Sequence, residues 1–393
     1  MFKKLFALLV MLMLAALPFW GMQVLAAPQA TTRYVAPGGV DGVNDCANSS
    51  NPCGSVVYAV QQTDTGDTVM VAAGWYTETD TIRLFRDVTI EGAGLDQTIV
   101  SVETNPDIYR VFQVYGDVTA AISHLTLRNA ERNGVHNLGD LTLSHVNIAD
   151  NRGALGGGGI YNNGVLVVSD SIIAGNRSSD VAGGLLNFGE ATIRRALFVG
   201  NKAGQSSYGG GLHNQGTLTL ENVTFTLNEG DAGTAVSNGG SGTINMTNVT
   251  IARNVNTQGS PASASAISNY GSSIQVVNTI IADNGPNQQC SGDVPLTSLG
   301  FNIDGHNGCH FDQANDQTFT DPLLDTFAQV TGTPNWVSAL TFFGNSPALD
   351  AGVGASCPAT DARGVARPIG AGCDIGAYEF DNYQIYLPAI IAP

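Results

Sequence analysis

The stretch Leu218-Thr-Leu-Glu-Asn-Val-Thr-Phe-Thr-Leu-Asn228 carries the pattern that decides the fold. Its apolar residues Leu218, Leu220, Val223 and Phe225 stand 10, 8, 5 and 3 positions before the closing asparagine. Alternation of this kind predicts two short strands with one buried face, and the change of parity between them predicts a bend.

Five other segments repeat this pattern. The closing asparagines of the six copies recur at a period of about 25 to 30, within the range of solenoid repeats: Asn151, Asn176, Asn201, Asn228, Asn254 and Asn284. A second asparagine column precedes the first at a nearly fixed distance: Asn137, Asn162, Asn187, Asn214, Asn238 and Asn269. The return segment varies more in length, so we expect one constrained side of each repeat and one side with variable loops.

A single copy of the repeat cannot bury its own apolar face, whereas stacked copies form a continuous core. Neighbouring coils would then lie about 4.8 Å apart through parallel β-ladders. The copies lack the leucine-rich-repeat consensus, and propeller blades need longer repeats. The sequence therefore predicts an all-β fold, a right-handed parallel β-helix (solenoid). Because its open ends need covering, we expect an N-terminal capping helix and a small C-terminal capping module.

The asparagine columns have a structural interpretation. Asparagine tolerates the left-handed conformation that a sharp corner needs, and its side-chain amide can both donate to and accept from the same residue one coil away. We therefore expect ladders of stacked asparagines with the closing asparagines in the left-handed conformation. A row of catalytic or sugar-binding asparagines is the alternative.

The N-terminal segment predicts export. Two lysines precede an apolar run over residues 5–17, and Val24 and Ala26 fit the positions before a cleavage site. Residues 1–26 are thus interpreted as a signal peptide, with a retained membrane anchor as the alternative, although the run is short for a spanning helix. We expect a secreted or cell-surface protein with no transmembrane segment after removal of the signal.

The chain is acidic, with 33 Asp and Glu against 16 Lys and Arg and a net charge of −17. Removal of the two signal-peptide lysines makes the charge −19. Such a surface repels nucleic acid and anionic membranes, so we expect no nucleic-acid partner. The carboxylates could recruit Ca²⁺, but excess acid also keeps secreted proteins soluble. We expect no cofactor, with Ca²⁺ as the alternative, and a monomeric protein.

The six cysteines fall into three local groups. An even number in an exported chain suggests disulfides, and zinc would need tighter Cys or His spacing. The clustering favours Cys46–Cys53, Cys290–Cys309 and Cys357–Cys373.

The N-terminal end carries an ordered set of motifs. Residues 55–62 predict a short amphipathic helix, which stands among Tyr34-Val-Ala-Pro-Gly-Gly39, the Cys46 to Cys53 segment, Gly66-Asp67-Thr68 and Gly74-x-Tyr76-x-Glu78. This set resembles the start of secreted bacterial proteins of the pectin-lyase-like β-helix superfamily. The resemblance implies a capping helix before Gly-Asp-Thr and the first coil after it.

The C-terminal end resembles the choice-of-anchor Q domain of secreted bacterial β-helix proteins. The resemblance rests on Leu299-Gly-Phe-Asn-Ile303, Asp321-Pro-Leu-Leu324, Asn345-Ser-Pro-Ala-Leu-Asp-Ala-Gly352, Cys357-Pro-Ala-Thr-Asp-Ala-Arg-Gly364, Arg367-Pro368 and Cys373-Asp-Ile-Gly-Ala-Tyr-Glu379. The usual Asp-Gln-Arg-Gly is Asp-Ala-Arg-Gly here. The resemblance implies fold, export and surface display, and it implies no chemistry.

These observations divide the chain into five parts: a signal peptide (1–26), a cap with the first strands (33–80), parallel β-helix coils (81–300), the choice-of-anchor-Q-like module (301–380) and an apolar tail (381–393). We expect the tail to pack on the module as a last strand. A truncated anchor and a recognition tag are the alternatives.

A catalytic cluster in a stacked fold would form from one outward position in successive coils. The positions six and seven before the closing asparagines bring together Asp170 with Arg195 and Arg194 with Glu221. These four are the candidate catalytic residues, because a carboxylate–guanidinium cluster could bind or process an acidic sugar. Ordinary cross-strand ion pairing is the favoured alternative, since no two carboxylates meet as a glycosidase requires.

The sequence favours a non-catalytic, exported or surface-displayed protein that binds carbohydrate or another surface. A polysaccharide lyase or glycoside hydrolase of the superfamily is the first alternative. A purely structural surface protein is the second.

Overall fold

The computed structural model describes residues 30–103, 110–154, 156–256, 265–285, 289–328 and 339–381. The predicted signal peptide and, apart from Asp381, the apolar tail lie outside these residues. The described residues from Thr31 onward belong to one compact unit. Within the described ranges, no helix combines the length and the hydropathy needed to cross a bilayer.

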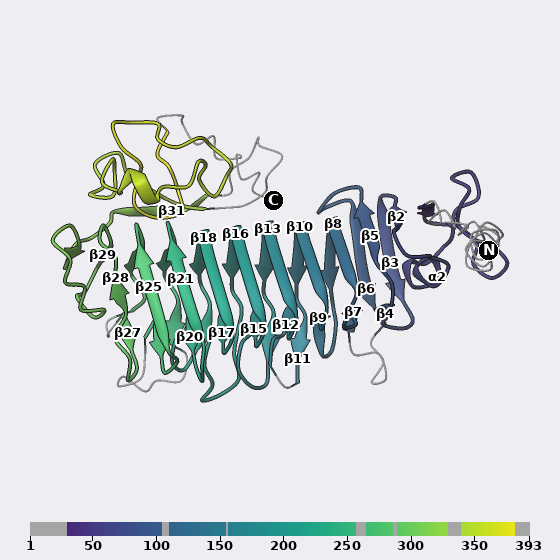
Figure 1. Cartoon of the computed structure of the whole chain (residues 1–393), viewed down its shortest axis with the longest axis horizontal. Helices are drawn as coiled ribbons and strands as arrows, with labels where there is room; N and C mark the ends of the chain where they lie inside the picture. Colours follow the sequence, from purple (N-terminus) through teal and green to yellow (C-terminus); the bar gives the residue numbers. More distant parts are fainter. Residues whose placement is uncertain are drawn as a thin grey trace, which may run out of the picture. The chain divides into compact units, whose positions relative to one another are not determined.

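The fold is a right-handed parallel β-helix whose long strands stack side by side (Figure 1). The largest sheet, sheet A, joins each coil to the next through parallel ladders in the register that the repeats predict, such as Leu141↔Leu166 and Leu166↔Ala191. Its strands are β1 (Thr32–Val35), β2 (Asp67–Val71), β3 (Gly74–Glu78), β5 (Val88–Gly92), β6 (Thr98–Val102), β8 (Thr119–Arg128), β10 (Asp140–Ala149), β13 (Val165–Ala174), β16 (Glu190–Val199), β18 (Thr217–Thr226), β21 (Thr243–Thr247), β22 (Thr250–Ala252), β25 (Ser273–Val277), β26 (Ile280–Ala282), β28 (Thr297–Ser298), β29 (Ile303–Asp304) and β30 (Gln317–Thr318).

Two further faces close each coil. Sheet B consists, in the described part of the chain, of short strands: β4 (Ile82–Leu84), β7 (Arg110–Val114), β9 (Asn133–Asn137), β12 (Ile160–Asn162), β15 (Leu185–Asn187), β17 (Leu212–Asn214), β20 (Val236–Asn238), β24 (Ile267–Asn269) and β27 (Cys290–Ser291). The third face is formed by the pairs β11 (Arg152–Gly153) with β14 (Arg177–Ser178) and β19 (Glu229–Gly230) with β23 (Val255–Asn256).

The core follows the predicted parity. Leu218, Leu220, Val223 and Phe225 are all fully buried. The parity changes at the residue six positions before each closing asparagine, where φ is positive, as in Asp170 (φ 51°). A single left-handed residue turns the strand and lets the side chains on both sides of the bend point into the same core.

Both predicted asparagine ladders are present. In each column the side-chain Nδ2 donates to Oδ1 of the next asparagine, at 2.9–3.0 Å in the closing column and 2.7–3.0 Å in the other. The expectation that the closing asparagines are left-handed is wrong. The left-handed residue is the one before each closing asparagine, for example Gly200 (φ 63°). The left-handed residue makes the corner, and the asparagine behind it turns inward and satisfies the buried backbone.

The predicted capping helix is α2 (Val56–Gln61), with Ser55 as its N-cap. The buried Glu78 carboxylate accepts hydrogen bonds from the backbone N–H groups of Val56 and Val57 at 2.8 and 3.0 Å. It therefore satisfies donors of the first turn that have no partner within the helix. Asp67 likewise binds the Arg33 guanidinium at 2.9 and 3.0 Å. Both acids of the N-terminal motifs hold the cap together.

The C-terminal module contains the antiparallel pair β31 (Leu324–Ala328) and β32 (Ala339–Phe342) and the 3₁₀ turn η1 (Gly354–Ser356). Hydrogen bonds hold its backbone against the bends of sheet A: Asn222 Nδ2 donates to the Thr360 carbonyl, and Asn248 Nδ2 donates to the carbonyls of Asp374 and Gly376. The module therefore contacts the outer surface of sheet A.

The three predicted disulfides, Cys46–Cys53, Cys290–Cys309 and Cys357–Cys373, are present, and they account for all six cysteines.

Candidate functional site

The outer face of sheet B carries an unusual group of side chains. Parallel pairing places the middle residues of successive strands in one row, in the order Arg83, Gln113, His136, Tyr161 and Leu186. Because register-matched side chains on a parallel sheet point the same way, polar and aromatic groups from distant parts of the chain meet on one surface.

Arginines gather at the N-terminal end of this face. Arg110 begins β7 and pairs in register with Asn133, whose chain neighbour is Arg132. Burial, followed by repulsion from Arg132, lowers the pKa of Arg110, and Arg83 acts in the same direction. The buried Nε of Arg110 has no hydrogen-bond partner among the described residues. No carboxylate in the same ranges forms an ion pair with Arg110, so the structure leaves this partly desolvated cation without a counter-charge there.

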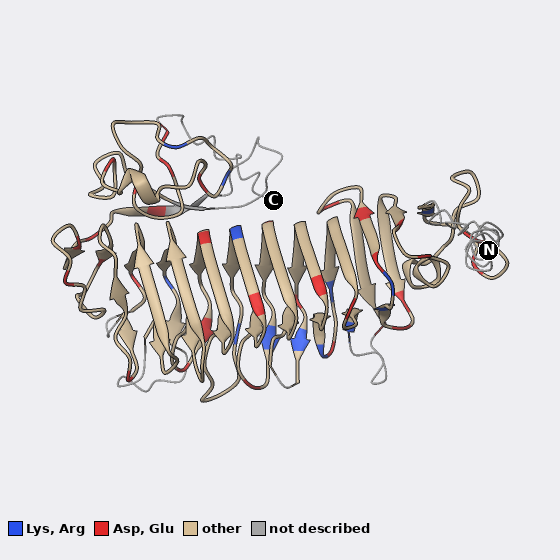
Figure 2. Ribbon diagram, viewed as in Figure 1, with Lys and Arg blue, Asp and Glu red and all other residues tan. Residues whose placement is uncertain are grey.

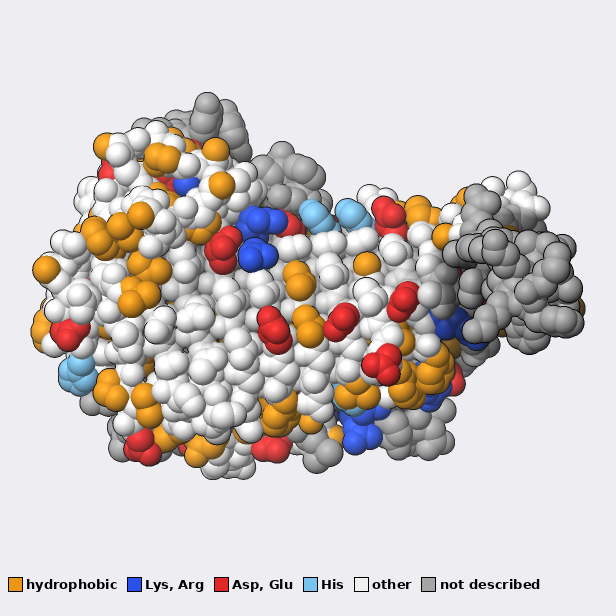
Figure 3. Space-filling view, in the orientation of Figure 1, with side chains coloured by type: hydrophobic (Ala, Val, Ile, Leu, Met, Phe, Trp, Pro, Cys, Tyr) orange, Lys and Arg blue, Asp and Glu red, His pale blue; other side chains and the backbone are white. Residues whose placement is uncertain are grey.

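Aromatic rings continue from the arginines along the same face. His136 meets Tyr161 edge-on, with ring centroids 5.0 Å apart, and Tyr161 lies 5.6 Å from Phe188 in the next coil. Phe188 is 40% exposed. Rings in this position offer an apolar surface to a ligand rather than to the core. Figure 3 shows basic side chains beside a histidine and hydrophobic side chains along the lower edge of the view.

These groups line a cavity of about 250 Å³, here called the sheet B cavity. Its lining consists of Arg110, Arg132, Asn133, His136, Leu138, Gly156, Tyr161 and Asn163. Burial, together with Arg110 and Arg132, lowers the pKa of His136 to about 4. His136 is thus a neutral imidazole at pH 7, and its Nδ1 lacks a hydrogen-bond partner in the described structure.

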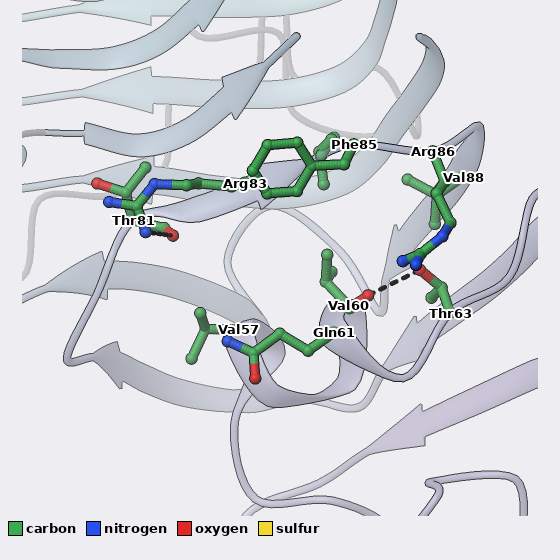
Figure 4. Close-up of a pocket in the computed structure, with 10 residues that line it drawn as sticks. Val57, Val60, Gln61, Thr63, Thr81, Arg83, Phe85, Arg86 and Val88 are labelled. Carbon is green, nitrogen blue, oxygen red and sulfur yellow. Dashed lines mark hydrogen bonds between the residues drawn. The ribbon is translucent and has the colours of Figure 1, made fainter.

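A smaller cavity of about 180 Å³ lies beside the capping helix (Figure 4). Arg83 and Phe85 stand on one side of it, and Val57 and Gln61 of α2 stand on the other. The Phe85 ring stacks on Tyr115, with centroids 4.4 Å apart. This stack extends the aromatic surface from the sheet B cavity toward the cap.

The four residues predicted from the repeat meet as pairs at the bend of sheet A. Arg195 holds both oxygens of Asp170 at 2.7 Å, and the Asp170 bond is the largest cause of a raised Arg195 pKa. Arg194 lies 3.8 Å from Glu221, and both side chains are partly exposed. The pairing is the one that the repeat predicts, and in each pair the arginine lies beside a carboxylate of the neighbouring coil.

The repeat brings His136 to Tyr161, since each directly precedes an asparagine of the second column, but it does not predict the arginines of the sheet B cavity. Arg110 and Arg132 lie in early coils that do not keep the repeat. Both belong to return segments, whose lengths vary from coil to coil. The one available signal was the distribution of charge: ten of the 16 basic residues, but only 12 of the 33 acids, lie between residues 83 and 202.

No group of three or more His, Cys, Asp or Glu that could hold a metal ion occurs in the ranges that the structure describes.

His213, in the same sheet B row, predicts a pH dependence of stability. It is 7% exposed, and burial lowers its pKa to about 4. A histidine whose folded pKa lies below its unfolded value of about 6.5 contributes stability that is present above pH 6.5 and lost as the pH falls through 4. We expect a loss of about 3 kcal/mol over this window, which His213→Gln should remove.

Denaturant unfolding at several pH values checks this expectation, with His310→Gln as the control at an exposed histidine. Equal pH dependence of His213→Gln and the unchanged protein would contradict it.

Comparison with known proteins supports the fold. No protein-family model and no curated protein sequence matches the chain. Among solved structures, the pectate lyase Pel9A is similar with a TM-score of 0.54 and 14% identity, over 89% of this chain and 96% of that one. A pectin methylesterase from Aspergillus niger is similar with a TM-score of 0.37 and 10% identity, over 75% of this chain and 87% of that one. At 14% identity, the likeness to Pel9A shows the fold alone.

Proposed function

We propose that this protein binds an acidic polysaccharide on the outer face of sheet B and does not turn it over. The observation that carries the proposal is the uncompensated, partly desolvated Arg110 beside the aromatic row of His136, Tyr161 and Phe188. A uronic acid unit has the complementary chemistry, since its carboxylate accepts two parallel hydrogen bonds from a guanidinium. The apolar face of its ring can pack on tyrosine.

Size and charge agree with this ligand class. The sheet B cavity, of about 250 Å³, is too small for a drug-sized ligand. It suits one sugar unit, with neighbouring units resting on Phe188 and on the Phe85–Tyr115 stack. The net charge of −17 would repel a polyanion at a distance. A local cluster of arginines is therefore what makes contact with such a polymer favourable.

Isothermal titration with oligogalacturonate tests the proposal. Arg110→Gln should weaken binding about 10- to 100-fold, the loss expected for a charge-assisted hydrogen bond of about 1.5–3 kcal/mol. The variant should fold normally, because it removes a partly buried cation that has no ion-pair partner in the described ranges. Arg194→Gln is the charge-matched control, on sheet A and away from the cavity.

Unchanged affinity in Arg110→Gln would overturn the proposal. A loss confined to Arg194→Gln would move the site to the bend of sheet A. Raised salt should weaken the binding of the unchanged protein, since exposed arginine–carboxylate contacts are screened.

A polysaccharide lyase is the second candidate, favoured by the neutral His136 that lines the same cavity. A base in this position could take the proton beside a carboxylate that Arg110 holds, with elimination of the neighbouring glycosidic oxygen as the leaving group. Appearance of unsaturated sugar products that depends on His136, and is absent in His136→Gln, would establish this candidate. Turnover lost in Arg195→Ala would instead place catalysis at the sheet A bend.

We also propose that the protein acts outside the cell, held at the surface through its C-terminal region. The three disulfides support an oxidising compartment, and the signal-like N-terminus and the choice-of-anchor-Q-like motifs support export and display. Fractionation of the source cells with an antibody against the β-helix would test the location. Recovery in the cytoplasm would contradict it.

A further inference from the structure

A second group of cations lies at the corner between sheet A and the third face. Arg152 of β11 pairs in register with Arg177 of β14, and Arg177 pairs with Lys202 through a parallel bridge. Parallel pairing spaces these side chains about 4.8 Å apart, one per coil. Three like charges in one row repel each other unless an anion lies between them.

Among the described residues, neighbouring carboxylates pair with Arg152 and Lys202 at the two ends of this row, but not with Arg177 at its centre. Arg152 lies 3.7 Å from Glu131, and Lys202 lies 2.6 Å from Glu229. Arg177 forms no ion pair with any residue in the described ranges. The uncompensated charge is therefore the middle one, flanked by a cation on each side.

A cavity of about 410 Å³, here called the corner groove, opens beside this row. Arg128, Arg152 and Arg177 line it, together with Asp150, which holds Arg128 at 2.7 Å. Gly175 at the groove wall has a positive φ of 61°, and an added Cβ would stand 2.9 Å from the Asp150 carboxylate. A side chain at Gly175 would therefore press on the Asp150 carboxylate at the wall of the groove.

The corner groove and the sheet B cavity belong to the same coils but to different faces. Glu131 lines the first and Arg132 lines the second, although the two are adjacent in the chain. Figure 2, in the view of Figure 1, shows basic residues where β11 lies, at the lower end of the long strands of sheet A.

We propose that the corner groove is a second binding site for an acidic polysaccharide, so that one molecule holds two chains and cross-links them. The ligand class rests on the proposed function, whereas the second site rests on Arg177 and its groove. Divalent binding raises the avidity for a polymer network without any new contact at either site. The protein would then tie acidic polymers together at a surface.

Two measurements with galacturonate probes test the inference. Titration with a short oligogalacturonate should give two sites per chain in the unchanged protein and one in Arg177→Gln. Beads coated with polygalacturonate should aggregate with the unchanged protein, whereas Arg177→Gln should bind the beads without aggregating them. Arg110→Gln should behave in the same way through loss of the other site. Arg253→Gln, with the same change in charge at an arginine that lines neither cavity, should keep both sites.

The outcomes separate this inference from the proposed function. If Arg177→Gln keeps two sites and still aggregates beads, the inference fails while the sheet B site stands. If Arg110→Gln changes nothing but Arg177→Gln abolishes all binding, the sheet B site and the cross-linking both fail. Aggregation by the unchanged protein with one site per chain would also overturn the inference, because self-association would then supply the second contact.

Discussion

Arg367→Ala is expected to destabilise the C-terminal module by about 3–5 kcal/mol, the usual cost of removing one partner from a buried ion pair. Arg367 lies 3.0 Å from Glu379, and their side chains are 0% and 1% exposed. The arginine also donates to the carbonyls of Asp374 and Gly376. Its loss leaves a buried carboxylate without its cation and removes a donor from each of two carbonyls.

The loss of Arg367 should also weaken the contact between the C-terminal module and sheet A. The Asp374 and Gly376 carbonyls that Arg367 holds are the same ones that accept hydrogen bonds from Asn248. Hydrogen exchange of the Ile369 and Asp374 amides, which donate to the Glu379 carboxylate, measures the local free energy of opening. Exchange should accelerate there and remain unchanged in the central coils.

Two controls make this prediction specific. Arg194→Ala removes a partly exposed arginine whose partner lies 3.8 Å away. This control should cost less than about 1 kcal/mol. Arg367→Met combined with Glu379→Gln removes both buried charges and should recover part of the loss. Unchanged exchange in Arg367→Ala would show that the pair does not hold the module.

Asn201→Ala is expected to lower the free energy of unfolding of the β-helix by about 3–6 kcal/mol, because it removes several buried hydrogen bonds at once. The buried Asn201 Oδ1 accepts from the backbone N–H and the side-chain Nδ2 of Asn176, and its Nδ2 donates to the Ile173 carbonyl at 2.8 Å. Alanine removes a partner from each of these buried groups, and a buried group left unsatisfied costs about 1–3 kcal/mol.

A matched asparagine provides the control, since Asn245 is exposed on β21. Asn245→Ala should change the free energy of unfolding by less than about 0.5 kcal/mol, as is usual for surface substitutions. Denaturant unfolding of both variants decides the prediction. Equal stabilities would mean that the ladder contributes nothing beyond its backbone contacts.

The glycine variant distinguishes the two possible roles of Asn201. The sequence pattern alone suggests that Asn201→Gly is milder than alanine, because glycine adopts the left-handed conformation freely. In the structure the left-handed residue is Gly200, so glycine at position 201 gains no conformational relief. We therefore expect Asn201→Gly to be at least as destabilising as Asn201→Ala.

The sequence by itself determined whatever repeats from coil to coil. The intervals between asparagines set the register, because a stacked fold brings residues one repeat apart into contact. The apolar spacing identified the buried positions such as Leu218 and Phe225, and the same register brought Asp170 to Arg195. Local signals were enough for the capping helix and the three short-range disulfides, since their partners lie close together in the chain.

Tertiary structure alone decided the features that break the repeat. Arg110 and Tyr161 lie two coils apart, and return segments of unequal length separate their strands, so no sequence interval relates them. The contact of Asn248 with the Asp374 carbonyl of the C-terminal module spans 126 residues and has no periodic signal. The sequence did not predict the left-handed conformation of Gly200 for a different reason: both residues of a Gly-Asn corner tolerate a positive φ. Only the inward hydrogen bonds of the asparagine side chain assign that conformation to the glycine.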